Sequence, residues 1–420
     1  LFTGLGRDLI NPRGRAGMVV PSGIATDYYT QDFFSDLVEN KQLVSLYDFE
    51  NSKGIFQEVH RSYKFSLITL TGRDLPSQEA DFAFYLTEVQ QLQDDDRHFS
   101  LTEEDLRQIN PNTGSCPIFR SQSDAEVARR LYEGAPVLIN ENEDRNPWGV
   151  DISRLIDLNG DSELLATEED LAEKNAELSA NLNYIDGEDR WLRVYEGKMI
   201  NIYNHRFAST YTVEGSQRSG RSTETEGSQL LDPEYLVNTR FWVEEGDVDD
   251  KNGNWSRDWY FSYMDVCAAT NKRTMIAGII PESAPSFSLR VLTDSSADAP
   301  YICCLLANYN SFSYDFAARQ SVGGVHLSDH VVKQLPVIPP KRYSDDILRF
   351  VVPRVLELSY TAWDLAPFAD DVWSEANDGL RKAISEQWNS NSDLRDGNEL
   401  GEPEWVNHSD STDDYFPHTP

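Results

Sequence analysis

Three short apolar runs near the start of the chain predict β-strands. Residues 16–21, 43–49 and 63–70 are rich in β-branched and aromatic side chains and are bounded by Gly, Pro or Asn. Between the first two runs, four apolar residues recur at helical spacing: Phe33, Phe34, Leu37 and Val38. Asp27 is the expected N-cap of that helix. The pattern predicts a strand–helix–strand unit of an α/β sheet. The third strand is expected to pair antiparallel at or near the sheet edge, because the segment before it is too short for a crossover helix.

Two further regions continue the alternation of strand and helix patterns. Residues 80–87 are typical of another strand, and residues 100–109 predict a helix that Ser100 or Thr102 would cap. Residues 259–340 contain alternating and fully apolar segments separated by polar turns. This second stretch predicts a separate region that mixes strands and helices.

The C-terminal part of the chain combines polar and helical segments. Residues 212–233 are poor in apolar side chains and rich in Ser, Gly, Thr and Glu, so we expect a loop or linker there. Residues 343–373 have a helical pattern in which Pro353 is expected to kink or break the helix. Residues 377–389 predict another helix, and the acidic tail 391–420 is expected to be frayed.

Composition narrows the class of protein. Hydrophobic residues make up 39% and aromatic residues 11% of the 420 residues, which is enough for packed cores in two or three domains. No apolar run approaches the ~20 residues that a membrane-spanning helix needs, and no signal peptide opens the chain. The four cysteines lack the spacing of a metal site: Cys116, Cys267, Cys303 and Cys304. We therefore expect buried thiols in a reducing cytoplasm.

The charge of the chain leaves two interpretations open. The 71 acidic residues outnumber the 37 Lys and Arg residues, giving a net charge of −34. Non-specific binding to phosphates requires the opposite sign, so the chain could be an acidic protein that does not touch DNA. The alternative is a halophilic protein from a cytoplasm at molar salt, where an acidic surface maintains solubility. We favour this alternative, with DNA bound through a local basic face and base contacts.

Several segments carry a resemblance to a known family. In the first part of the chain these are Val20–Asp27, Tyr47–Asn51 and Lys64–Phe65; Asn110–Thr113, Cys116–Ser121, Asp124–Glu126 and 193–211 follow. The longest match has these residues: Asn308, Asn310, Ser311, Asp315, Arg319, Gln320, Gly323, Gly324, His326, Leu327, Lys333, Gln334, Leu335 and Pro336. Together the segments resemble the C-terminal part of the N6-adenine DNA methyltransferases of type IIG restriction–modification and phage-defence systems.

The resemblance implies the fold class and the order of domains. The fold would be α/β, with the distal part of a Rossmann-like methyltransferase sheet followed by a mixed α+β target-recognition domain and C-terminal helices. The implied segments are a distal methyltransferase part (1–75), an α+β connecting region (76–235), the recognition domain (236–340), helices (341–390) and the acidic tail (391–420).

The resemblance also implies functional residues. Phe56, in the loop before the third predicted strand, would stack on an adenine flipped out of the duplex; the alternative is a core Phe. The implied contacts to DNA are Lys64, His205, Arg206, Arg319, Gln320, His326 and Lys333. For residues 193–211 the alternative is a packed strand pair with an exposed His. From the residues alone, Arg120, Arg129 and Arg130 could face phosphate or acid partners, although a solvated helix face is the commoner outcome.

The methyl donor in this family is S-adenosyl-L-methionine. The family holds it with a Gly-rich turn and holds the target amine with an Asn/Asp-Pro-Pro-aromatic loop; neither motif occurs in the 420 residues. We therefore expect the C-terminal part of a larger enzyme, or half of a split one, without catalytic residues and inactive alone. Its expected partners are double-stranded DNA, an N-terminal methylase segment or companion chain, and restriction or defence proteins. The competing interpretation is a non-catalytic polypeptide that reads DNA for a separate catalytic chain.

One acidic segment invites comparison with a calcium-binding loop. Its oxygen-bearing residues fall at loop positions 1, 3, 5 and 12: Asp157, Asn159, Asp161 and Glu168. Ser162 stands where an EF-hand has Gly, and Pro147 and Gly149 interrupt the entering helix. We therefore expect no metal site in this segment.

Overall fold

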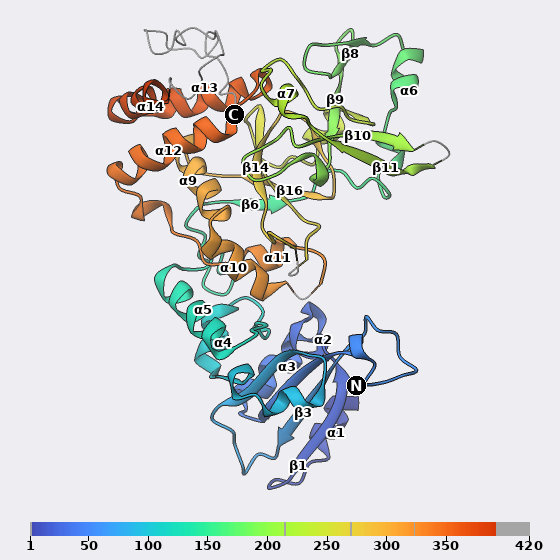
Figure 1. The fold of residues 1–420 in the computed structure, drawn as a ribbon, viewed down its shortest axis with the longest axis vertical. Coiled ribbons are helices and arrows are strands. Elements are labelled where there is room, and N and C mark those ends of the chain that lie inside the picture. Colours follow the sequence, from blue (N-terminus) through green and yellow to red (C-terminus); the bar gives the residue numbers. More distant parts are fainter. Residues whose placement is uncertain (1, 214–215, 269–270, 323, 392–420) are drawn as a thin grey trace. The chain divides into compact units, whose positions relative to one another are not determined.

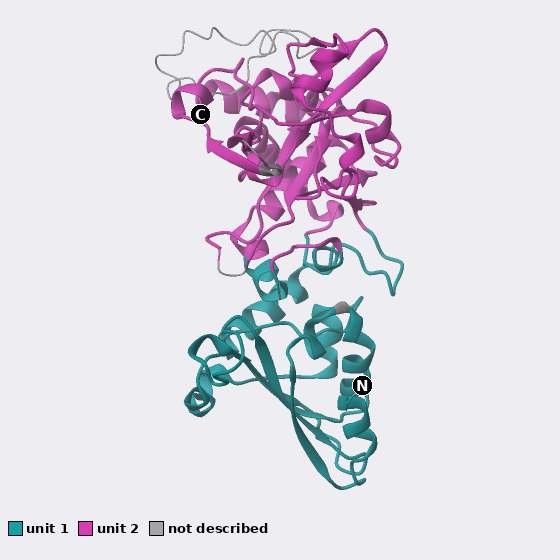
Figure 2. Cartoon of the chain, turned by 90° about the vertical axis from the view of Figure 1, so that its right-hand side faces the viewer, with its two compact units in different colours: residues 1–146, 316–324, 330–337 teal, residues 147–315, 325–329, 338–420 magenta. Residues whose placement is uncertain are grey.

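A computed structural model describes residues 2–213, 216–268, 271–322 and 324–391. The chain forms two compact units (Figure 2). Unit 1 contains residues 1–146, 316–324 and 330–337, and unit 2 contains 147–315, 325–329 and 338–420. Mixed sheets and C-terminal helices confirm the predicted α/β fold class (Figure 1). Among the described residues, no helix has both the length and the apolar character needed to span a membrane.

A five-stranded sheet forms the centre of unit 1. Its strands are β1 (Arg15–Pro21), β2 (Leu43–Glu50), β3 (Lys64–Thr71), β4 (Ala80–Leu86) and β5 (Phe99–Leu101), in the order β1-β3-β2-β4-β5. β3 is antiparallel to both β1 and β2, and β4 is parallel to β2. β1, β2 and β4 therefore run in the same direction. The antiparallel β3 lies one strand in from the β1 edge, as the sequence predicts.

Helices complete unit 1: α1 (Phe2–Asp8), α2 (Gly23–Thr26), α3 (Gln31–Glu39), α4 (Glu103–Ile109) and α5 (Gln122–Gly134). Phe34 and Leu37 of α3 are fully buried in one apolar core with the sheet. Thr102 caps α4, as predicted. The expectation for Asp27 is wrong: it is the C-cap of the short α2, and α3 begins after Thr30. A short helical turn directly after β1 therefore separates the strand from the predicted helix.

Unit 2 contains three β structures. A five-stranded sheet has the order β12-β9-β8-β7 with β15 beside β9, a four-stranded sheet has the order β14-β13-β16-β6, and β10 and β11 form a hairpin. The strands are β6 (Asp151–Ser153), β7 (Glu177–Leu178), β8 (Tyr184–Asp186), β9 (Asp189–Tyr195), β10 (Ala208–Val213), β11 (Ser216–Glu224), β12 (Trp242–Glu244), β13 (Trp259–Met264), β14 (Ala277–Pro281), β15 (Ala284–Pro285) and β16 (Leu289–Asp294). The loop predicted over 212–233 is thus partly wrong, because β11 pairs with β10 through its backbone although its sequence is polar.

The remaining helices are α6 (Glu168–Glu173), α7 (Gly227–Leu230), α8 (Glu245–Asp249), α9 (Ala299–Tyr309), α10 (Phe312–Ser321), α11 (Asp329–Val332), α12 (Asp345–Ser359), α13 (Ala366–Glu375) and α14 (Asp378–Ser390). α14 confirms the helix predicted over 377–389.

The break predicted at Pro353 is wrong, because α12 continues through it while packing against α9 and α14. Burial of Val352 and Leu356 on either side stabilises the helix despite the missing N–H. Of the predicted acidic tail, residues 392–420 lie outside the described residues.

Candidate nucleic-acid interface

The candidate site lies at the edge of the unit 1 sheet where the carboxyl ends of its parallel strands meet. Because β1, β2 and β4 run the same way, their carboxyl ends at Pro21, Glu50 and Leu86 lie at the same edge, where the antiparallel β3 begins with Lys64. Ligands of open α/β sheets bind outside the carboxyl ends of the strands. This edge is therefore a candidate functional site.

A buried carboxylate fixes the turn that follows β1. Asp48 of β2 accepts hydrogen bonds on Oδ1 from the hydroxyl of Ser22 and, at 2.8 Å, from the hydroxyl of Ser66. Burial raises the pKa of the Asp48 carboxyl, and the two hydroxyl hydrogen bonds and the nearby Lys64 offset part of that rise. The three side chains tie β1, β2 and β3 together at this edge.

Basic side chains gather around Tyr85 near the end of β4. The Arg120 guanidinium carbon lies 4.8 Å from the centre of the Tyr85 ring, and Lys64 Nζ lies 5.9 Å from it. Burial raises the pKa of the Tyr85 phenol, against the opposing charges of Arg120 and Arg319. The structure thus brings together Lys64 and Arg319, which the sequence proposed, with Arg120. The Asp48 carboxylate also raises the pKa of this phenol, so the three cations lie close to a buried acid.

The loop between β2 and β3 holds Phe56 in a defined position. The buried Asn51 accepts from the backbone N–H of Phe56 at 2.9 Å and donates to the carbonyls of Phe56 and Val59 at 3.0 and 2.8 Å. The Phe56 ring packs edge to face on Phe65, with centroids 4.9 Å apart, yet Phe56 remains 42% exposed. A fixed aromatic ring with an accessible surface suits stacking on a base, and it is not a fully buried core residue.

The recognition residues proposed near α10 and α11 have different environments. Gln320 is buried in unit 1, where its backbone carbonyl accepts from the backbone N–H of Ile118 at 2.9 Å. Lys333 forms an ion pair with Glu141 at 2.7 Å. In unit 2 the exposed His326 places Nδ1 3.1 Å from a carboxylate oxygen of Asp265. His326 is accessible to a ligand from solvent, whereas Gln320 is not.

Two residues proposed as DNA contacts lie inside unit 2 instead. His205 and Arg206 are both 0% exposed, so neither reaches a surface to which DNA could bind, and we assign both to the structure of the unit. The Arg206 guanidinium donates to four backbone carbonyls: Leu230, Asp232, Tyr235 and Thr361. The alternative of a packed strand pair with an exposed His is wrong as well, because His205 is buried and β9 and β10, at the two ends of this stretch, belong to different sheets.

His205 belongs to a buried charged cluster. Its Nε2 lies 2.9 Å from Asp364 Oδ1, and Asp364 Oδ2 accepts from Arg193 Nη2 at 2.6 Å. Burial lowers the pKa of His205, and the neighbouring Asp364 opposes that shift. Burial alone would raise the pKa of Asp364, but His205 and Arg193 hold it below its usual range. The cluster joins strand β9 to the segment before α13.

In the acidic segment compared with a calcium-binding loop, the carboxylates bind other groups of the chain. Asp157 Oδ1 accepts from the N–H groups of Asn159 and Gly160 at 2.9 and 3.2 Å. Asp161 pairs with Lys251 at 2.6 Å. In the described part of the chain, no group of three or more His, Cys, Asp or Glu residues could hold a metal ion. The four cysteines are buried free thiols, as predicted.

Tyr85 and Asp48 were missed as members of the site by the sequence analysis. A signal was available for Tyr85, because it stands near the end of a strand predicted over residues 80–87 and such ends share an edge in a parallel arrangement. The role of Asp48 depends on Ser22 and Ser66, which belong to two other strands or turns, so sequence spacing could not reveal it.

Comparisons with known proteins give limited results. No family model matches the chain, and no curated protein does. It is similar to the solved structure of the type IIG restriction endonuclease BpuSI, with 12% identity over 93% of this chain and 49% of that chain, at a TM-score of 0.32. It is also similar to the type IIL restriction–modification enzyme MmeI, solved in complex with DNA, with 11% identity over 92% and 50% of the chains and a TM-score of 0.37. The chain spans about half the length of each. At these TM-scores we base no functional argument on the likeness.

Proposed function

We propose that the chain is the DNA-recognition part, with the distal sheet strands, of a site-specific DNA adenine-N6 methyltransferase of a restriction–modification or phage-defence system. The family in this proposal is the one that the sequence motifs resemble. The observation that carries the proposal is the sheet edge of unit 1, where a half-exposed Phe56 stands on the β2–β3 loop and Lys64 and Arg120 surround Tyr85 near the end of β4.

Each part of this edge has a task in the proposed function. An adenine inside a duplex is out of reach of an enzyme until it is flipped out of the stack. The exposed surface of Phe56 would stack on the flipped base, an interaction worth about 1–3 kcal/mol. Lys64 and Arg120 would contact phosphates, which position the duplex without reading its sequence. His326 of unit 2 is a candidate for a base contact.

The methyl donor S-adenosylmethionine would supply an activated methyl group, but the described residues of this edge do not fit it on their own. Asp48 is the buried carboxylate here, and its Oδ1 already accepts from Ser22 and Ser66. We therefore derive no step of methyl transfer from this chain and assign donor binding to an N-terminal methylase segment or a companion chain.

A second candidate is a non-catalytic recognition polypeptide that serves a separate catalytic chain. Neither the Gly-rich donor turn nor the Asn/Asp-Pro-Pro-aromatic motif occurs in the 420 residues, so the two candidates differ in where these motifs are encoded. The reading frame distinguishes the two candidates. The two motifs in the same frame upstream would support one enzyme, and the same motifs in a neighbouring frame would support a split one.

DNA binding by the 420-residue chain tests the proposal. A pool of randomised duplexes would be titrated by fluorescence anisotropy between 50 and 200 mM salt, with Lys64→Met and the control Lys41→Met. Lys41 lies just before β2 begins, at the opposite edge of the same sheet. Loss of a phosphate contact should lower the salt slope by about one unit for Lys64→Met and leave it unchanged for the control. No binding to any duplex at 50 mM salt, or equal slopes for both variants, would contradict the proposal.

A further inference from the structure

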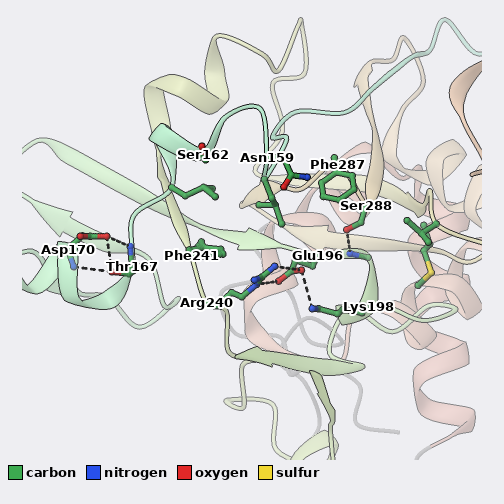
Figure 3. Close-up of a pocket in the computed structure, with 15 residues that line it drawn as sticks. Asn159, Ser162, Thr167, Asp170, Glu196, Lys198, Arg240, Phe241, Phe287 and Ser288 are labelled. Atoms are coloured by element: carbon green, nitrogen blue, oxygen red, sulfur yellow. Dashed lines mark hydrogen bonds and ion pairs between the residues drawn. The ribbon is translucent and has the colours of Figure 1, made fainter. Parts of the chain in front are cut away.

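The segment first compared with a calcium loop forms one wall of a cavity in unit 2. The cavity has a volume of about 610 Å³ and is shown in Figure 3. Leu158 and Leu165 line it from this segment, while Asp157 and Asp161 are occupied within the loop and by Lys251. The carboxylates of Asp157 and Asp161 are therefore engaged by groups of the chain itself.

Two cations share one carboxylate at the centre of the cavity lining. Arg240 donates from Nε and Nη2 to the two oxygens of Glu196 at 2.8 and 3.2 Å, and Lys198 Nζ lies 3.3 Å from the same carboxylate. Burial would raise the pKa of Glu196, but Arg240 and Lys198 hold it below its usual range. Glu196 and Arg240 are buried, whereas the Lys198 side chain is 32% exposed. Lys198 Nζ also donates to the Gly220 carbonyl at 3.3 Å, and it is the more exposed of the two cations.

The position of Lys198 is fixed by a close backbone contact. Gly197 donates its N–H to the Ser288 hydroxyl at 2.8 Å, and a Cβ on Gly197 would stand 2.7 Å from the Ser288 carbonyl oxygen. A side chain does not fit there without movement of the backbone. The segment that carries Glu196 and Lys198 is therefore held tightly against the segment before β16, as Figure 3 shows for the labelled residues.

The walls around this group combine apolar and polar side chains. The apolar ones are Leu158, Leu165, Phe241, Met264, Val266 and Phe287, and the polar ones include Asn159, Ser162 and Ser288. The second carboxylate of the lining is Asp170, which accepts from the N–H and the hydroxyl of Thr167, both at 2.8 Å. In Figure 3, Asp170 lies on the helix with Thr167, away from the Arg240–Glu196–Lys198 group. The cavity thus offers an accessible cation beside apolar and aromatic surface.

We propose that this cavity binds a single nucleotide, with its phosphate at Lys198 and its base against the apolar walls. A Lys ammonium binds phosphate as a point charge, and aromatic and apolar side chains stack on bases of any sequence. The volume falls within the usual range of small-ligand pockets. The choice of a nucleotide over another organic anion rests on the proposed function. The nucleotide has two possible sources, an unstacked position of a DNA strand or a free mononucleotide.

Calorimetric titration of the full chain tests the site. Deoxyadenosine monophosphate should bind more tightly than either deoxyadenosine or inorganic phosphate. Lys198→Met removes the accessible cation and should weaken binding by about tenfold, the size expected for a charge-assisted hydrogen bond. Leu165→Trp fills the cavity without changing its charge and should also weaken binding. The control is Lys382→Met, an exposed lysine of α14 in the same unit, which should bind as the parent does. Circular dichroism would confirm that each variant is folded.

A duplex with one bulged deoxyadenosine separates the two sources. Displacement of the monophosphate by this duplex supports the site and assigns it to DNA, and binding without displacement supports it and assigns it to a free nucleotide. Equal affinity for nucleoside and monophosphate, or unchanged binding in both cavity variants, overturns the inference. A chain that binds plain duplex but no monophosphate overturns this inference alone. A chain that binds the monophosphate but no duplex overturns the proposed function and supports the cavity site.

Discussion

The change Asp364→Asn tests the buried charge cluster of unit 2. It keeps the size of the side chain and removes the negative charge that faces Arg193 Nη2 at 2.6 Å and His205 Nε2 at 2.9 Å. The Arg193 and Asp364 side chains are only 1% and 2% exposed. Within the described residues, Arg193 Nε and Nη1 have no hydrogen-bond partner that would offset the loss. Removing one partner of a buried ion pair destabilises a protein by about 3–5 kcal/mol.

Urea unfolding at pH 7 and scanning calorimetry would measure the effect. A loss of that size corresponds to roughly 6–20 °C in the melting temperature of a unit of this length. The matched control is Asp346→Asn, whose partner Arg349 lies on the same helix and whose side chain is 90% exposed. We expect the control to change stability by no more than about 0.5 kcal/mol. If Asp364→Asn lost no more stability than Asp346→Asn, the buried pair would not be held as described.

Four further predictions follow from the same structure. The stability difference between the parent and Asp364→Asn should shrink as the pH falls below about 3.8, the ordinary pKa of Asp, because the folded pKa is lowered and the unfolded carboxylate takes up a proton first; urea titrations from pH 3 to 8 would show this. In the completed enzyme, Phe56→Ala should reduce methylation per folded molecule by roughly tenfold, and a normal rate together with a melted fold would contradict base stacking. His326→Ala should change sequence preference at one base pair in a selection from randomised duplexes; an unchanged selected site would contradict base readout. The 420-residue chain alone should transfer no methyl group from S-adenosylmethionine to adenine, and transfer in a clean assay would overturn the division of tasks proposed above.

The sequence predicted much of unit 1 because its signals are local. Each apolar run, in β1, β2 and β3, and the cap of α4 is contained within a few consecutive residues, and the structure confirms all four. β11 was missed because its strand is polar and pairs in a two-stranded hairpin through its backbone, which leaves no apolar alternation to detect. The break expected at Pro353 is absent from α12, because burial of the neighbouring side chains stabilises the helix around it.

The candidate site was less predictable, because its partners are distant in the sequence. His205 and Arg206 looked like surface contacts in a stretch of mixed aromatic and basic residues. Their partners include Asp364 and the carbonyl of Thr361, which lie more than 150 positions away. Lys64 and Arg319 were named from motifs, but only the folded sheet places both beside Tyr85. Whether a basic residue is buried or exposed depends on contacts with residues distant in the sequence. The spacing of apolar residues along the chain does not encode those contacts.

The division of unit 1 along the chain has a consequence for synthesis on the ribosome. Backbone N–H groups of Ile118, Leu138 and Ile139 donate to the carbonyls of Gln320, Leu335 and Lys333, and residues 147–315 of unit 2 are made in between. At roughly 5–20 residues per second, roughly 10–40 s pass between residue 146 and the completion of residue 337. During that interval the first 146 residues emerge before residues 316–337 exist. Those three amides have no carbonyl to donate to, and the adjoining apolar surface is not yet covered. Unit 1 can therefore close only after residues 147–315 and 325–329 of unit 2 have been synthesised, and nascent chains stopped before residue 337 should be bound by chaperones or degraded.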